Sequence, residues 1–256
     1  MRRYYITMGL FFLIAAMLFL IPVSGTTRLF ILLADLLVLA ALLVYGVSRI
    51  NSGFFVPATC AGDRAGNLVA LTFDDGPDPS RSREIMELFA RFHGKASFFL
   101  TGFKVEGNEN VVKEMAAAGH SIGNHSFSHS NWFPLFRGRA ISREIRETNR
   151  ILEGITGNPV KFFRPPFGVT NPNIHRGLQG TGLKVIGWSI RSFDTRNEEA
   201  GKIVRRITRK LRGGDIVLLH ETSGNVIQVL EQLLPIIGSR GLKCVSLDQM
   251  ADGGPA

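Results

Sequence analysis

The sequence predicts an α/β fold in which parallel strands form a sheet that is closed or nearly closed into a barrel. From residue 68 onward, short apolar runs alternate with longer amphipathic segments, the rhythm that repeated βα units produce. Polar and charged residues follow directly after these runs, where the loops of such a barrel carry function. Two long apolar stretches come first, so we expect a helical hairpin in front of the barrel.

Two membrane-spanning helices are predicted near the N-terminus, over residues 4–23 and 29–47. Each is long enough to cross a bilayer core, and Asp35 is the one charged residue within them, which we expect to face the partner helix or a headgroup. The turn between them is short, so both open ends lie on one side. A secretory signal peptide is the competing interpretation, because Arg2 and Arg3 precede an apolar core, but that core is longer than signal peptides use.

The membrane face that carries the rest of the chain stays open. Arg2 and Arg3 lie before the first helix and Arg49 after the second, whereas Arg28 lies in the turn. This weak bias favours a cytoplasmic position for both termini.

The domain organisation follows from changes in composition: a hairpin, a linker rich in Gly, Pro and Ala, a catalytic domain and a tail, over residues 1–50, 51–66, 67–250 and 251–256. The linker contains Cys60, and the second cysteine of the chain is Cys244. They would pair if the first and last strands were neighbours, but two separate thiols are favoured.

Within the domain, apolar runs mark strands, and apolar residues at helical spacing mark helices. Ser80 is expected to cap the first helix, Asn108 or Asn110 to begin the second and Gly154 to close the third. Strands are predicted over residues 68–73, 95–100, 120–123, 160–163, 183–188, 215–220 and 243–247, and helices over 81–92, 108–119, 141–152, 172–180, 197–211 and 226–237.

Two adjacent carboxylates, Asp74 and Asp75, follow the first strand, and Gly76-Pro77 fixes the turn behind them. Neighbouring residues leaving a strand point in different directions, so one carboxylate can bind a metal while the other takes a proton. A solvated turn is the alternative for this motif alone. His125 and His129, four residues apart after a later strand, favour the metal, because two imidazoles and one carboxylate leave positions open as catalytic zinc requires.

These residues belong to a series of motifs that resembles the NodB-homology polysaccharide deacetylases, carbohydrate esterase family four. The resemblance extends over about residues 68 to 247 and implies a distorted (β/α) barrel of about seven strands. In chain order the five motifs are Thr72-Phe73-Asp74-Asp75-Gly76-Pro77, His125-Ser126-Phe127-Ser128-His129, Arg164-Pro165-Pro166-Phe167-Gly168, a divergent segment from Trp188 to Asp194, and Leu218-Leu219-His220.

The resemblance implies that Asp75, His125 and His129 bind one divalent metal. Zinc is the simplest choice, with cobalt, manganese and nickel as alternatives. Asp74 would then act as the general base that removes a proton from the attacking water.

By the same resemblance, His220 is the general acid for the leaving amine, although a lone His after an apolar run is more often a core residue. Arg164 would orient Asp74, and Asp194 would orient His220. Substrate contacts are implied for Pro165, Pro166, Phe167, Trp188 and Leu218.

The fourth motif departs from the family pattern, in which Asp-x-x-Asp-Trp is frequent. This chain has Arg191-Ser192-Phe193-Asp194-Thr195, so Thr195 stands where an aromatic residue walls the groove. Trp188 or Phe193 is expected to replace that wall. Phe167 replaces a frequent Tyr, but the role that the resemblance implies at this position belongs to the backbone N–H and not to the side chain.

The sequence therefore predicts a membrane-anchored, metal-dependent hydrolase of carbon–nitrogen bonds that removes N-acetyl groups from a peptidoglycan-like or chitin-like glycan. One alternative is a deacetylase or deformylase of a lipid-linked saccharide at the membrane surface. Another is a glycan-binding pseudoenzyme, which the complete set of metal ligands, base and acid argues against. We expect the bacterial cytoplasmic membrane; many relatives act outside it, and some act on lipid-linked sugars at either face.

The charge balance does not indicate nucleic acid. From Pro57 onward 26 Lys and Arg stand against 20 Asp and Glu, and no aromatic-basic motif accompanies them, so an anionic lipid or acidic glycan is the expected partner. The identity of the sugar and the oligomeric state stay open.

Overall fold

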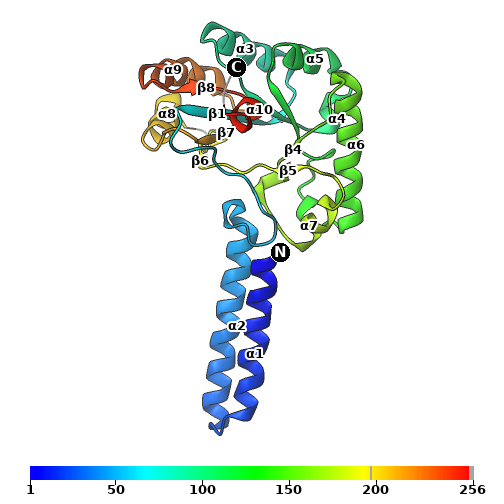
Figure 1. The fold of residues 1–256 in the computed structure, drawn as a ribbon, viewed down its shortest axis with the longest axis vertical. Coiled ribbons are helices and arrows are strands. Elements are labelled where there is room, and N and C mark those ends of the chain that lie inside the picture. Colours follow the sequence, from blue (N-terminus) through cyan, green and yellow to red (C-terminus); the bar gives the residue numbers. More distant parts are fainter. Residues whose placement is uncertain (197, 254–256) are drawn as a thin grey trace.

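Strand β1 (Leu68–Gly76) lies at the centre of the parallel sheet around which the chain folds (Figure 1). This computed structural model describes residues 1–196 and 198–253. The strand order is β5-β4-β3-β2-β1-β7-β6, and β8 pairs with the first residues of β1. The other strands are β2 (Ser97–Leu100), β3 (Ser121–Asn124), β4 (Phe162–Phe163), β5 (Lys184–Val185), β6 (Ile190–Arg191), β7 (Ile216–His220) and β8 (Lys243–Cys244).

Helices cover the outer face of this curled sheet (Figure 1). The predicted α/β fold is confirmed, and the carboxyl ends of its parallel strands meet at one edge. The helices are α3 (Pro79–Arg91), α4 (Gly102–Val105), α5 (Glu109–Ala117), α6 (Gly138–Thr156), α7 (Pro172–Leu178), α8 (Ala200–Thr208), α9 (Val226–Ser239) and α10 (Leu247–Ala251), with short 3₁₀ turns η1 (Ile50–Ser52), η2 (Phe133–Leu135) and η3 (Pro166–Gly168).

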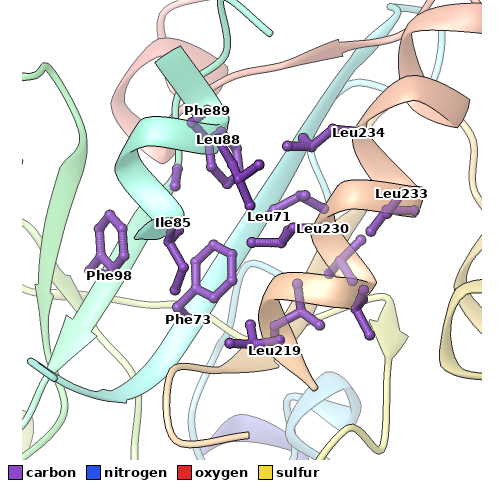
Figure 2. Packing of buried hydrophobic residues seen from close by; sticks show 14 of the residues in the cluster. Leu71, Phe73, Ile85, Leu88, Phe89, Phe98, Leu219, Leu230, Leu233 and Leu234 are labelled. Atoms are coloured by element: carbon purple, nitrogen blue, oxygen red, sulfur yellow. The ribbon is translucent and has the colours of Figure 1, made fainter. Parts of the chain in front are cut away.

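The largest core lies between β1, α3 and α9 (Figure 2). Leu71 and Phe73 point from β1 toward Ile85 of α3 and Leu230 of α9, and all four side chains are fully buried. Because side chains alternate along a strand, the intervening Thr72 and Asp74 face the concave side of the sheet. The same strand therefore supplies a hydrophobic core on one face and a polar interior on the other.

Several predicted boundaries are wrong for local reasons. The N-cap of α3 is Asp78, whose carboxylate accepts hydrogen bonds from the N–H groups of Ser80 and Arg81, so Ser80 lies inside the helix. Helix α6 continues through Gly154 and ends at Thr156, and the next residue, Gly157, adopts a φ of 69° that favours glycine.

The later elements are also shorter than predicted. The strand expected over 183–188 ends at Val185 and is followed by the unpredicted β6. The strand expected over 243–247 stops at Cys244 because Ser246 caps α10. The helix expected over 197–211 begins at residue 197, which lies outside the described residues. The end of the expected tail, residues 254–256, lies outside them as well.

The segment expected as a linker instead fills the gap that the sheet leaves open between its two edges. Thr59 forms a parallel bridge with Ile186 beyond β5, and Ala61 forms an antiparallel bridge with Asp215 beside β7. Phe55, within the same segment, is buried. Cys60 lies in this segment, and it and Cys244 are free thiols, so the two cysteines do not pair.

Helices α1 (Arg2–Leu20) and α2 (Gly25–Ser48) form an antiparallel hairpin that projects from the domain (Figure 1). Both are long and apolar enough to cross a membrane, and most of their large side chains are exposed. The open end of the hairpin is fixed to the domain. The N-H of Thr170 donates to the Val47 carbonyl oxygen at 3.2 Å and its hydroxyl to that of Gly46 at 3.1 Å, and the amino group of Met1 donates to Phe55.

Glu221 is a fully buried carboxylic acid beneath the junction of β1 and α3. The Ser82 hydroxyl and, at 3.4 Å, the Asp78 N–H donate to its Oε2, whereas its Oε1 lacks a hydrogen-bond partner among the described residues. A Cβ at Gly76 would lie 1.7 Å from Oε1, so only glycine fits at the end of β1. Burial raises the pKa of Glu221 to about 7.

Replacing this carboxyl by an amide should change how stability depends on pH. The folded-state pKa is raised, so the neutral carboxyl contributes stability that is present below the unfolded pKa and is lost as pH rises through about 7. From about pH 5 to about pH 8, Glu221→Gln should therefore gain about 3 kcal/mol in free energy of unfolding relative to the wild type. Denaturant unfolding of the full chain in detergent at both pH values measures this. Glu87→Gln, on the exposed face of α3, is the matched control. If the free energy of unfolding of Glu221→Gln depended on pH as that of the wild type does, the titrating group would not be Glu221.

Candidate active site

Three side chains that could hold a metal ion converge at the carboxyl ends of β1 and β3. Asp75 Oδ1 lies 3.2 Å from His129 Nε2 and 3.6 Å from His125 Nε2. One donor atom from each of the three lies within 4.8 Å of the others. Two imidazole nitrogens and a carboxylate oxygen suit zinc and several other divalent metals, so this donor set fits the predicted metal site.

Backbone conformation aims these side chains at one another. Asp75 adopts a φ of 70°, which breaks the alternation of β1 and turns its carboxylate away from the outer core. The Lys104 ammonium group donates to the Asp75 carbonyl oxygen at 2.7 Å and holds this conformation. His129 likewise has a positive φ, 46°, at the end of the loop that follows β3.

His125 is held in the form that a metal ligand needs. Its Nδ1 lies 2.7 Å from the carbonyl oxygen of Arg164, which leaves Nε2 facing Asp75. Burial first, and then the charge of His129, lower the pKa of His125 to about 3. The imidazole is therefore neutral at ordinary pH.

The loop between the two histidines depends on Glu144 of α6. Its carboxylate accepts hydrogen bonds from the N–H groups of Phe127 and Ser128, at 3.1 and 2.9 Å, and from the Ser128 hydroxyl. The Ser126 hydroxyl accepts from the His129 N–H at 3.1 Å. Glu144 and Lys104 were missed at the sequence level, because each acts from a distant helix and belongs to no motif.

Asp74 and Arg164 form a fully buried ion pair. Arg164 Nη1 lies 2.6 Å from Asp74 Oδ1 and 2.8 Å from the Thr72 hydroxyl, and the other guanidinium nitrogens donate to the carbonyl oxygens of Ile186 and Gly187. Asp74 Oδ2 lies 3.7 Å from His125 Nε2, so this oxygen faces the metal-binding residues. The structure thus brings Arg164 against Asp74 as predicted.

His220 and Asp194 form a second pair, at the end of β7. Asp194 Oδ1 lies 2.9 Å from His220 Nδ1, and Oδ2 accepts the His220 N–H at 2.8 Å. The Ser192 hydroxyl also donates to Asp194, at 2.7 Å. Burial alone would lower the pKa of His220, but the Asp194 hydrogen bond and the charges of Asp74, Asp194 and Asp75 outweigh it and raise that pKa.

The five residues expected to contact substrate occupy different environments. Phe167 is exposed, adopts a φ of 61° and lies with its ring centre 5.0 Å from that of His129. A Cβ at Gly168 would lie 2.2 Å from the ring of Trp188, so this ring packs closely against the residue that follows Phe167. The other three are buried and can act through backbone or as interior lining: Pro165, Pro166 and Leu218.

This arrangement can bind a metal, accept a proton and donate one within a single site. Asp74 Oδ2 and the metal-binding atoms lie on one side, and the imidazole of His220 enters from the neighbouring strand, which pairs with β1 at Asp74 and His220. Such a combination suits hydrolysis of an amide, whose amine leaves only when it is protonated.

Comparisons with known proteins agree with this geometry. A family profile described as polysaccharide deacetylase matches residues 61–186. A peptidoglycan-N-acetylglucosamine deacetylase of Bacillus cereus is 32% identical over 186 residues, covering 71% of this chain and 67% of that protein. A chitooligosaccharide deacetylase of Rhizobium leguminosarum bv. trifolii is 32% identical over 209 residues, covering 76% of this chain and 96% of that protein.

Solved structures give the same picture. An acetyl xylan esterase of family 4 from Clostridium thermocellum, in complex with a cobalt ion, superposes with a TM-score of 0.67 at 30% identity, covering 73% of this chain and 93% of that one. A pseudoenzyme of the same family from Bacillus anthracis gives a TM-score of 0.70 at 26% identity, covering 77% of this chain and 69% of that one. The predicted resemblance and the class of carbon–nitrogen hydrolase are confirmed at the level of the family. This chain belongs to the polysaccharide deacetylases of NodB homology, carbohydrate esterase family four.

Proposed function

We propose that this protein is a metal-dependent deacetylase that hydrolyses the N-acetyl groups of N-acetylated sugars in a glycan. The observation that carries the proposal is the convergence of the metal-binding atoms of Asp75, His125 and His129 on Asp74 Oδ2, with His220 on the adjacent strand. A divalent metal held there, zinc in the simplest case, supplies a Lewis acid that lowers the pKa of a water molecule and polarises the acetyl carbonyl group.

Asp74 then serves as the general base. Arg164 binds its Oδ1, so Oδ2 takes the proton as the water oxygen forms a bond to the acetyl carbon. The buried guanidinium also fixes the orientation of this carboxylate. The oxygen that develops negative charge would meet the backbone N–H of Phe167, because the hydrogen bonds that close this turn use the N–H groups of Gly168 and Val169 instead.

His220 completes the reaction as the general acid. Asp194 holds Nδ1, so Nε2 delivers a proton to the sugar nitrogen as the carbon–nitrogen bond breaks. The products are acetate and a free amine on the sugar. The raised pKa of His220 keeps the imidazolium available for this transfer.

A glycan-binding pseudoenzyme is the second candidate, because a pseudoenzyme of this family shares the fold. This chain keeps the metal-binding set, the base and the acid together with the residues that orient them. A binding protein needs no buried ion pair behind a general base, so we favour the enzyme.

We further infer that the α1–α2 hairpin is a retained membrane anchor. Met1 and Thr170 tie the open end of the hairpin to the domain, and Tyr4, Leu43 and Val47 pack against a core cluster. Cleavage of α1 as a signal peptide would remove the contacts of Met1 and Tyr4. The anchored domain would rest directly on the membrane surface, within reach of an N-acetylated glycan or a lipid-linked saccharide.

The enzyme should release acetate from N-acetylglucosamine oligomers. We expect the purified full chain in detergent, loaded with zinc or cobalt, to produce acetate and free amine, and a chelator to abolish both. Asp75→Ala should lose metal binding and activity together, whereas Glu87→Gln should keep both. Tight metal binding without acetate from any N-acetylated sugar, including lipid-linked ones, would favour the pseudoenzyme.

The pair of His220 and Asp194 should set the alkaline limit of activity. His220→Gln should lower kcat by about 10²- to 10⁴-fold, the usual contribution of a general acid. In Asp194→Asn the imidazolium loses its carboxylate, the pKa of His220 falls, and the alkaline limb of the kcat/KM profile should move to lower pH. A lower rate with an unmoved limb would mean that Asp194 only supports the fold.

Anchoring predicts that the chain keeps its N-terminus and stays with membranes. After alkaline carbonate washing, the protein should remain in the membrane fraction, and its intact mass should include α1. A mature chain that begins after the turn at Ser24 would instead identify α1 as a cleaved signal peptide.

A further inference from the structure

A cavity of about 560 Å³ lies where α2 meets the domain. It is bounded by the end of α2, by the segment around β6 and by the end of α8. The residues lining it are Ser48, Arg49, Ile50, Asn51, Trp188, Ser189, Ile190, Arg191, Phe193, Arg206, Arg209 and Lys210. We call it the junction pocket.

Positive charge dominates the junction pocket. Arg49, Arg191, Arg206, Arg209 and Lys210 line it, and the described lining residues include no acidic side chain. Among the ion pairs of residues 1–196 and 198–253, only that between Arg206 and Glu198 involves any of these five. Clustered cations repel one another, so the pocket is suited to an anion that several of them can bind at once.

Aromatic contacts orient part of this charge. The guanidinium of Arg191 lies 4.9 Å from the ring centre of Phe193 and 5.8 Å from that of Trp188, and Arg206 lies 5.7 Å from Phe193. Arg206 also donates to the Ser192 carbonyl oxygen at 2.6 Å. Planar guanidinium groups held in this way are pre-organised for phosphate oxygens.

Trp188 separates the junction pocket from the catalytic groups. It lines the pocket, its ring centre lies 5.8 Å from the guanidinium of Arg164, and it packs against Gly168. Arg164 binds the base Asp74, and Phe167 beside Gly168 contacts His129. A ligand whose anionic part occupies the pocket can therefore place the next group of the molecule over the metal-binding residues.

The other side of the junction pocket is the end of the apolar hairpin. Ser48 is the last residue of α2, and exposed apolar side chains continue up to Tyr45. With the hairpin in a bilayer, the pocket lies at the depth of lipid phosphates.

We propose that the junction pocket binds the phosphate or diphosphate of a lipid-linked saccharide whose N-acetylated sugar reaches the catalytic residues. The proposal rests on the deacetylase activity and the membrane anchor inferred above, and it names the substrate class of that site. Bulk anionic phospholipid shares the phosphate chemistry, but the connection through Trp188 to the base favours the substrate.

The test compares two substrates for the full chain in nanodiscs of zwitterionic lipid: N-acetylglucosamine oligomers and a prenyl-diphosphate-linked N-acetylglucosamine. Arg209→Gln with Lys210→Gln removes two pocket charges. Lys202→Gln with Arg205→Gln removes two charges from exposed positions of α8, the helix that directly precedes Arg209; these positions do not line the pocket, so this pair is the matched control. We expect the pocket pair to lose about 10- to 100-fold in kcat/KM on the diphosphate substrate, mainly through KM, with the neutral oligomers and the control unchanged.

Equal losses on both substrates, or none on the diphosphate substrate, would overturn the assignment. The assignment would also be overturned if nanodiscs of phosphatidylglycerol inhibited the enzyme as strongly as soluble prenyl diphosphate diesters do. The ligand of the pocket would then be the headgroup of bulk phospholipid. Calorimetry with UDP-glucose, a diphosphate diester without an acetyl group, tests anion binding by the junction pocket separately from the proposed deacetylase activity. Binding that the pocket pair weakens and the control keeps would support the pocket even if no acetate is released, and no binding by the wild type would refute it whatever the enzyme hydrolyses.

Discussion

The buried ion pair of Arg164 and Asp74 is the constraint on which the rest of the site depends. A guanidinium with no exposed surface loses its hydration, and the interior of the sheet must replace it. It does so with a carboxylate, a hydroxyl and two carbonyl oxygens, while the ring of Phe99 lies 4.1 Å from the guanidinium carbon. Removing one partner from such a pair typically costs about 3–5 kcal/mol, so replacing Asp74, the proposed general base, should also loosen the centre of the sheet.

The same arginine also links the proposed base to a proposed metal ligand. Its side chain holds Asp74, and its carbonyl oxygen holds the Nδ1 of His125, so the residue that directly follows β4 sets the position of a group on β1 and of one just after β3. On the other side of β1, Asp194 fixes His220 alone, since it binds both the ring and the backbone N–H of that residue. The proposed base and the proposed metal ligand His125 therefore share one hydrogen-bonded framework, and the pairing of β1 with β7 places His220 beside it.

Much of this framework could be predicted from sequence because parallel strands end at one edge of their sheet. Asp74, His125, Arg164 and His220 each follow an apolar run, and the order of the runs is enough to bring them together. What could not be predicted depends on contacts between distant segments. Nothing local shows that Thr59 pairs beyond β5 or that Glu144 holds the histidine loop. Glu221 directly follows His220, yet its burial depends on packing under Gly76, which no periodicity records.

The hairpin and the active-site loop are also joined more closely than a flexible linker would allow. Only two residues, Gly168 and Val169, separate Phe167, which lies beside His129, from Thr170, whose N–H and hydroxyl donate to the last turn of α2. If the hairpin spans a bilayer, the height of the catalytic groups above the membrane is therefore fixed by short covalent and hydrogen-bonded connections. A long polymer would have to approach this fixed site from the side, whereas a sugar attached to a lipid phosphate begins at the correct depth. The position of the junction pocket, between the end of α2 and Trp188, follows the same geometry and favours the lipid-linked substrate.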